Sequence, residues 1–130
     1  MIRILAPVVA LLALLAASSA PAQTVKIGMI LTLTGQFADA GAQLDNGVKT
    51  YMKQFGDTVA GRRIEIIRRD TGGVAPDLAK RLAQELIVRD NVDILAGFVL
   101  TPNALAAADV SAEAKKLMVV MNAATSIITT

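Results

Sequence analysis

The sequence predicts an α/β fold built on a parallel β-sheet. Short apolar runs alternate along the chain with stretches whose apolar residues recur every three or four positions. The first pattern is typical of strands buried on both faces, and the second of helices packed on a sheet. Because strands and helices alternate, right-handed βαβ crossovers and parallel strands are expected.

Four runs are expected to form the strands: 25–31, 64–67, 92–97 and 117–121. Turn residues follow them, as in the glycine-containing stretches after the first and second runs. Only a few residues separate the last run from Thr130, and no closing helix follows. We therefore expect an incomplete sheet with exposed apolar surface, and a chain that is a fragment of a longer protein.

Helices are expected between these strands. The first would present one apolar stripe, made of Leu44, Val48, Met52 and Phe55. In the second, apolar residues spaced by four form a wider face, made of Leu78, Ala79, Leu82, Ala83, Leu86 and Ile87. The third begins at the sequence Thr101-Pro102-Asn103.

Residues 1–22 have the three regions of a secretory signal peptide. Arg3 gives the positive start, the apolar run 4–17 follows, and Ala20 and Ala22 fit the small-residue cleavage pattern. We expect cleavage between Ala22 and Gln23, followed by export. A transmembrane anchor is the rival interpretation, but the apolar run is too short for one and contains Pro7.

Charge and composition exclude several classes of function. With 13 basic and 11 acidic residues, the net charge of +2 gives no reason to expect a nucleic-acid partner. The pairs Arg62-Arg63 and Arg68-Arg69 are interpreted as the solvated ends of a strand. Because the chain has no cysteine and no histidine, thiolate or imidazole catalysis, Cys/His zinc sites and disulfides are excluded.

No dinucleotide-binding or Walker-type glycine motif follows the first strand, so nucleotide binding is not expected. Asp39, Asp45 and Asp70 could form a carboxylate cluster at strand ends. Turn and cap roles explain Asp39 and Asp70 more simply. We therefore expect no cofactor, no metal and no catalytic residue.

The last two predicted strands each end in a turn of small residues that contains a threonine, Thr101 in one and Thr125 in the other. In a parallel sheet both turns would lie at the carboxyl edge, where such sheets bind ligands. With Thr101 as N-cap and Pro102 at the first helical position, the N–H groups of Asn103 and Ala104 would face an anion. The alternative is that Thr101 only caps its helix and Thr125 only fills a turn.

These groups predict a non-covalent site for a carboxylate. Thr101, Thr125 and peptide N–H groups would bind the anion, and the Ala123 carbonyl would accept a bond from an ammonium or hydroxyl group. The small Ala124 would let the backbone approach the ligand. Neutral donors suit a protein that releases its ligand, since a lysine or arginine would bind the anion more tightly.

Four segments form a distinctive combination: 25–28, 33–35 with Gly41, 92–97, and the sequence Asn122-Ala123-Ala124-Thr125. Together they resemble the leucine/isoleucine/valine-binding protein family across residues 23–130. These are periplasmic solute-binding proteins of branched-chain amino-acid-type ABC transporters, with the type I periplasmic binding fold. The resemblance implies a partial, Rossmann-like amino-terminal lobe, the second lobe lying in roughly 200 or more further residues.

The resemblance also implies roles for single residues. The loop after the third strand contributes the hydroxyl that binds the ligand carboxylate, here Thr101. The loop after the fourth contributes a small residue through its backbone, here Ala123, and a threonine, here Thr125. The chain departs from the family at Asn122, where a proline is frequent, and at Ala40, where amino-acid binders often have an aromatic residue.

The small Ala40 would leave room for a bulkier ligand. Family members that bind aromatic carboxylates resemble this chain in the Thr101-Pro102-Asn103 loop. The expected ligand is therefore either an aromatic or other hydrophobic carboxylate or a branched-chain amino acid.

From this resemblance we expect a periplasmic protein that delivers a small carboxylate to ABC permease subunits and catalyses no reaction. Two alternatives remain open. The same fold serves as the ligand-sensing domain of receptors, which a downstream transmembrane helix would favour. A truncated α/β enzyme would need a catalytic His or Cys outside this chain.

Overall fold

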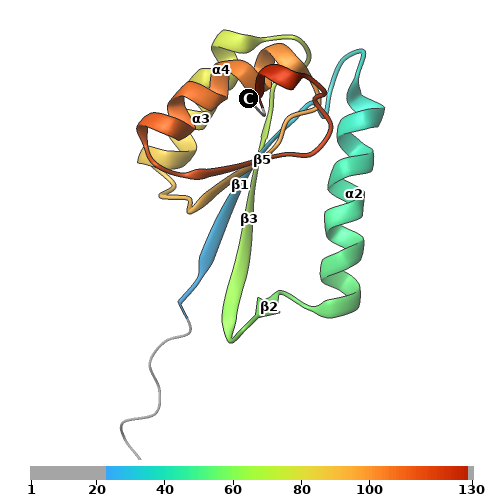
Figure 1. The fold of residues 1–130 in the computed structure, drawn as a ribbon. Coiled ribbons are helices and arrows are strands. Elements are labelled where there is room, and N and C mark those ends of the chain that lie inside the picture. The colour runs from blue at the N-terminus through green and yellow to red at the C-terminus, as the bar shows by residue number, and fades with distance from the viewer. Residues whose placement is uncertain (1–22, 129–130) are drawn as a thin grey trace, which may run out of the picture.

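A five-stranded sheet with the strand order β2-β3-β1-β4-β5 forms the centre of the protein. The computed structural model describes residues 23–128, so the expected signal peptide lies outside the described residues. Helices α3 and α4 cover one face of the sheet and α2 covers the other, as Figure 1 shows. Among the described residues, no helix is long and apolar enough to cross a membrane.

The strands agree with the predicted parallel architecture. They are β1 (Val25–Leu31), β2 (Thr58–Val59), β3 (Arg62–Asp70), β4 (Ile94–Gly97) and β5 (Leu117–Val120). β1 pairs in parallel with β3 and β4, and β4 pairs in parallel with β5. The expectation of a parallel α/β sheet is thereby confirmed.

The antiparallel strand β2 was not predicted. It pairs with β3 through a hairpin whose turn residues, Ala60 and Gly61, have φ values of 50° and 75°. Positive φ at both central positions is the signature of a type I′ turn, which matches the twist of paired strands. Two residues are too short to show a strand periodicity in the sequence, so only the turn glycine marked this region.

Three α-helices connect the parallel strands: α2 (Ala38–Phe55), α3 (Pro76–Val88) and α4 (Thr101–Glu113). A short 3₁₀ helix, η2 (Ser126–Ile128), follows β5. The wide apolar face predicted for α3 is confirmed, because Ala79, Leu82, Ala83 and Leu86 are all buried.

The core is divided between the two faces of the sheet. On the α3 and α4 face, Ile30, Leu86 and Leu95 pack with Phe98. On the α2 face, Met29, Leu31 and Ala96 pack against the half-buried Leu44 and Val48. Burial on both faces explains why the sequences of β1 and β4 are apolar with little alternation.

The predicted stripe of α2 is wrong at its last member. Phe55 is 67% exposed, and its ring lies against Tyr51, with the ring centroids 4.7 Å apart. Met52 lines the pocket at this end of the sheet together with Tyr51, which is itself 57% exposed. Phe55 lies outside this lining and packs on Tyr51, its helical neighbour four residues earlier.

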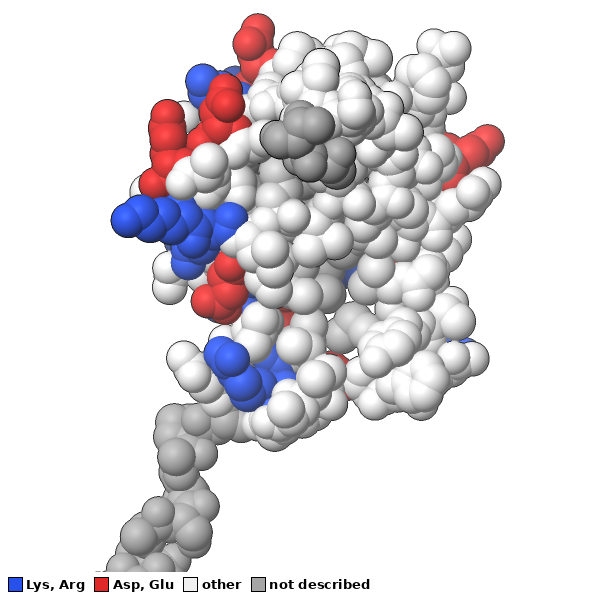
Figure 2. Space-filling model, viewed as in Figure 1, with Lys and Arg blue, Asp and Glu red and all other residues white. Residues whose placement is uncertain are grey.

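Apolar surface is exposed on β5, as expected. Leu117 is 62% and Val119 is 44% exposed, whereas Met118 and Val120 pack against the α3 and α4 core. Figure 2 shows most charged side chains of this view on the side of α3 and α4 and near the β2–β3 hairpin. The middle of the view, where β5 lies in Figure 1, is almost free of them.

Candidate functional site

The tips of β4 and β5 lie side by side at the carboxyl edge of the sheet. Gly97, the last residue of β4, pairs with Val120, the last residue of β5. Because the two strands are parallel, the segments that follow leave from the same edge. Thr101 and Thr125 lie on these two segments, and both are half-buried, so neither is sealed inside the core.

Hydrogen bonds connect the two segments directly. Met121 N donates to Gly97 O (2.8 Å), and Ala123 N donates to Phe98 O (3.0 Å). The Asn122 side chain donates through Nδ2 to Val99 O (3.0 Å). Asn122 therefore links the β5 tip to the segment after β4.

The turn after β4 is unusually sharp. Gly97 has φ 106°, and a Cβ atom there would lie 2.4 Å from Ile30 O. The buried Phe98 also has positive φ, 66°. Non-glycine residues seldom adopt this conformation, and Ala60, Asn91 and Lys115 also do so in turns of this chain, so the value at Phe98 marks a tight turn.

Thr101 is not the N-cap of α4, contrary to the prediction. Leu100 is the cap residue, with extended φ and ψ of −113° and 134° and no side-chain capping bond, and Thr101 is the first helical residue. Ala104 N donates to Leu100 O (3.1 Å), so its N–H group is engaged in the helix and not free for an anion, which corrects that expectation too. Within residues 23–128 the Thr101 hydroxyl makes no hydrogen bond, so it is available to a ligand.

Thr125 does have a local structural role. Its Oγ1 accepts a long hydrogen bond from Ile127 N (3.4 Å) at the start of η2. A threonine hydroxyl can accept and donate at the same time. Its proton therefore remains available for a carboxylate oxygen.

The other predicted site residues lie on the same loops or next to them. Ala123 is half-buried and packs against the α3 and α4 core, whereas Ala124 is exposed. Pro102 is exposed in the first turn of α4, and Ala40 is half-buried in the first turn of α2. The next residue along α2, Gly41, approaches β1 so closely that a Cβ atom would lie 1.8 Å from Thr32 O.

Asp70 organises the loops after β1 and β3. Its carboxylate accepts hydrogen bonds from Leu33 N (2.7 Å), Thr34 Oγ1 (2.7 Å) and Gly72 N (2.9 Å). Burial alone would raise the pKa of Asp70, but these hydrogen bonds outweigh it, and the pKa lies below its ordinary value. The turn role considered for Asp70 in the sequence is the one it has.

The hypothetical carboxylate cluster does not form. Asp45 is 5% exposed and pairs with Arg68 and with Lys49, whose Nζ lies 2.7 Å from Oδ2. Burial would raise the pKa of Asp45, but the bonds from Lys49 and Arg68 lower it overall. Asp39 is exposed in the first turn of α2. In the part of the chain that the structure describes, no group of three acidic residues could bind a metal ion.

The sequence predicted no role for the side chain of Asn103. Its side chain is 2% exposed and bonds to Thr71, Gly73 and Ala75 in the loop after β3. These partners lie 28 to 32 residues away in sequence, so no local spacing rule could have indicated them.

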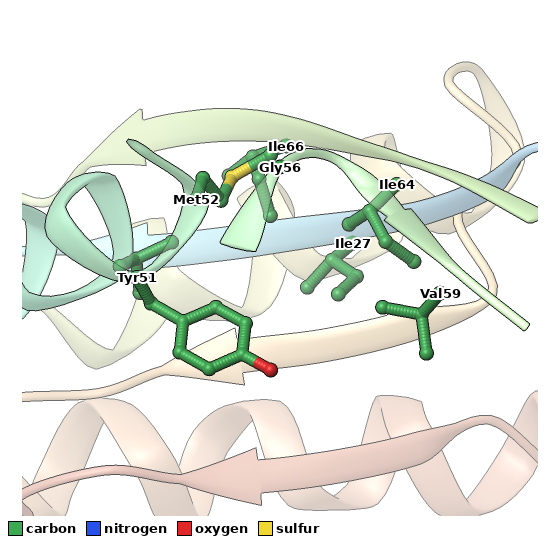
Figure 3. A pocket seen from close by; sticks show the side chains of 8 residues that line it. Ile27, Tyr51, Met52, Gly56, Val59, Ile64 and Ile66 are labelled. Atoms are coloured by element: carbon green, nitrogen blue, oxygen red, sulfur yellow. The ribbon is translucent and has the colours of Figure 1, made fainter. Parts of the chain in front are cut away.

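An apolar pocket of about 240 Å³ lies at the opposite, amino end of the sheet. Figure 3 shows its lining, which comes from β1, β2, β3 and the last turns of α2. The lining side chains are aliphatic apart from Tyr51, whose phenol is the polar group among them. A carboxylate would be left without enough donors there, so the pocket is a weaker candidate than the carboxyl edge.

Comparisons with known proteins were consistent with one another. Residues 24–129 match the family described as periplasmic binding protein. The Leu/Ile/Val-binding protein homolog 6 of Brucella abortus is 43% identical over 116 residues, which cover 89% of this chain and 30% of the relative. The chain thus spans about 30% of the length of this curated relative.

Two solved structures resemble the chain at a TM-score of 0.79, and in both the match covers 82% of this chain and 29% of the other. One is an ABC transporter solute-binding protein of Rhodopseudomonas palustris BisB5 in complex with 3,4-dihydroxybenzoic acid, 54% identical. The other is a solute-binding protein of R. palustris in complex with 4-hydroxybenzoate, 43% identical.

Proposed function

Because the chain belongs to the periplasmic binding protein family, we propose that it is the carboxylate-binding part of an ABC transporter solute-binding protein. The proposed ligand is an aromatic carboxylate of the hydroxybenzoate class, which the protein delivers to permease subunits in the membrane. The protein acts outside the cytoplasm and catalyses no reaction.

The arrangement of the β4 and β5 tips carries this proposal. Hydrogen bonds connect the two tips, and the Thr101 hydroxyl beside them has no partner among residues 23–128. One carboxylate oxygen would accept a bond from Thr101 Oγ1 and another from Thr125 Oγ1. Both donors are neutral, which favours release of the ligand to a permease.

Small side chains at the edge leave room for the ligand ring. Ala40 would begin the wall on the α2 side, and Ala123 and Ala124 would line the β5 side. Pro102 would contact the ring from the first turn of α4. In this pose the Ala123 carbonyl would accept a bond from a ring hydroxyl, which benzoate itself lacks.

Similarity to known proteins supports an aromatic ligand over an amino acid. The two R. palustris proteins, 54% and 43% identical to this chain, are in complex with hydroxybenzoates. A branched-chain amino acid is the second candidate, because the Brucella relative is named a Leu/Ile/Val-binding protein homolog. An aromatic acid brings no ammonium group, so it needs fewer acceptors than leucine does.

Isothermal titration calorimetry on the protein expressed from its complete gene tests the proposal. We expect saturable heat with 4-hydroxybenzoate and 3,4-dihydroxybenzoate and none with leucine. Heat with leucine alone would contradict the aromatic assignment, and no heat with any of the three would contradict the proposed function.

A further inference from the structure

Three buried polar side chains form a network beneath the carboxyl edge. Thr32 follows β1, Thr71 follows β3, and Asn103 lies in the first turn of α4. Thr32 Oγ1 and Thr71 Oγ1 are 3.1 Å apart, and Asn103 Nδ2 lies 3.2 Å from Thr71 Oγ1. All three residues are buried, so water cannot substitute for a lost bond.

Only one assignment of hydrogen-bond directions is consistent with the donors and acceptors of this network. Thr71 Oγ1 donates its single proton to Leu31 O (3.1 Å). It must therefore accept the proton of Thr32 as well as one from Asn103 Nδ2, which uses both of its lone pairs. Thr71 is the junction at which the β1 tip, the β3 tip and α4 meet.

The carboxamide of Asn103 fits its surroundings in one orientation. Oδ1 accepts from Ala75 N (2.9 Å), and Nδ2 donates to Gly73 O (2.8 Å) as well as to Thr71. A flipped amide would place an oxygen against the Gly73 carbonyl and an NH₂ group against the Ala75 N–H. Aspartate would also lack both donors, so this position requires a neutral amide.

We propose that Asn103 is the positioning residue of the binding edge. This inference rests on the proposed function, because Asn103 lies two residues after Thr101 on the same helical turn. Its three bonds fix the start of α4 against the loop after β3, and Thr71 in that loop is bonded in turn to Thr32 after β1. They thereby set where the Thr101 hydroxyl lies relative to the loop that leads to Ala40.

Asp70 extends the same network to the backbone of both loops. It precedes Thr71 and bonds to Leu33 N and Gly72 N. Displacement of Thr71 would therefore disturb both loops at once. A preorganised edge of this kind raises affinity because little ordering remains when the ligand binds.

The decisive variant is Asn103→Leu, which keeps the approximate size of the side chain and removes its three bonds. Thr71→Val is a second variant, which removes one of the three bonds of Asn103 and keeps those to Gly73 and Ala75. The matched control is Ser111→Ala. Ser111 is also buried in α4, but it bonds to Lys116 O (2.6 Å) at the far end of the helix.

Two readouts are measured on the protein expressed from its complete gene. The first is the Kd for 4-hydroxybenzoate, measured well below the Tm of each variant. We expect Asn103→Leu to raise the Kd about tenfold, which corresponds to about 1.4 kcal/mol. Thr71→Val should raise it less, and Ser111→Ala should lower the Tm without changing the Kd.

The second readout is amide hydrogen exchange without ligand. In Asn103→Leu, the amides of Leu33, Gly72 and Ala75 should exchange faster, whereas the Gly56 amide, at the other end of the sheet, should not change. If Asn103→Leu lowers the Tm but leaves the Kd unchanged, the positioning role is overturned. It is also overturned if the Gly56 amide exchanges faster to the same degree as the amides of Leu33, Gly72 and Ala75. If the wild-type protein binds no carboxylate, the proposed function fails, and the exchange pattern alone decides whether Asn103 organises these loops.

Discussion

The two ends of the sheet are stabilised by different kinds of contact. At the carboxyl edge, the half-buried Asp70 and the buried Asn103 connect loops that are distant in sequence. At the amino edge, the apolar pocket and the exposed ring of Phe55 lie close to a short hairpin. Directional bonds set positions more narrowly than apolar contacts, so we expect the loops of the carboxyl edge to be held more rigidly than the lining of the pocket.

The largest expected difference concerns two glycines of α2. A Cβ atom at Gly41 would lie 1.8 Å from Thr32 O, whereas one at Gly47 would meet nothing within 4 Å. Gly41→Ala should lower the free energy of unfolding by about 3 kcal/mol or more, because backbone must move. Gly47→Ala should raise it by about 0.5–1 kcal/mol through better helix propensity.

Urea denaturation of both variants measures this difference. Equal effects of the two substitutions would show that α2 does not approach β1 as closely as the structure has it.

A second comparison uses two aspartates, one at each end of the sheet. Asp70 accepts three hydrogen bonds at the carboxyl edge, whereas Asp57 at the amino edge accepts from Thr58 and Arg63 near the surface. Asp70→Asn should cost about 2 kcal/mol, because the neutral amide lacks the charge that strengthens the bonds from Leu33 N and Gly72 N. Asp57→Asn should cost less than about 1 kcal/mol. A loss at Asp57 as large as that at Asp70, in the same denaturation assay, would contradict the contrast between the edges.

Low pH should destabilise the protein at two places, at Asp70 in the carboxyl edge and at Asp45 in α2. The pKa of each of these carboxyl groups is lowered in the folded protein. Below about pH 5, where unfolded aspartates begin to bind protons, the unfolded chain takes up more protons than the folded one. The free energy of unfolding should therefore fall as the pH drops through this range. The loss should be smaller in Asp70→Asn, and denaturation curves recorded at several pH values would show whether the slopes differ as expected.

The smallest effect is expected at Phe55. Phe55→Ala removes an exposed ring and its contact with Tyr51, so it should cost about 0.5–1.5 kcal/mol. A cost of about 3–5 kcal/mol, typical of a buried phenylalanine, would instead support the stripe inferred from the sequence. Thermal unfolding distinguishes these two outcomes.

The spacing of apolar residues predicted the structure correctly where the residues of the pattern pack against the core. The leucines and alanines of α3 and the apolar run of β1 lie where their patterns predicted, because both are buried against the same core. Phe55 and β2 were mispredicted for opposite reasons. Phe55 continues the helical spacing but lies outside the pocket that Met52 lines, and β2 is too short to have a spacing at all.

The candidate site was predictable only in part. Parallel pairing of β4 with β5 brings the segments bearing Thr101 and Thr125 to one edge, as the order of elements predicted. The cap of α4 lies one residue earlier than expected, because Leu100 O already accepts the first helical bond. The Asn103 network joins residues of three separate loops, so only the folded chain reveals it.

The most direct test of the central claim compares two threonines at opposite ends of the sheet. Thr101→Val keeps the shape of the side chain but removes the proposed carboxylate donor. Thr58→Val removes the hydroxyl that bonds to Asp57 on β2 (3.2 Å). In calorimetric titrations with 4-hydroxybenzoate, Thr101→Val should raise the Kd about tenfold, the loss of one good hydrogen bond, while Thr58→Val leaves it unchanged. Equal Kd values for wild type and Thr101→Val would contradict the claim that the β4 and β5 tips bind the carboxylate.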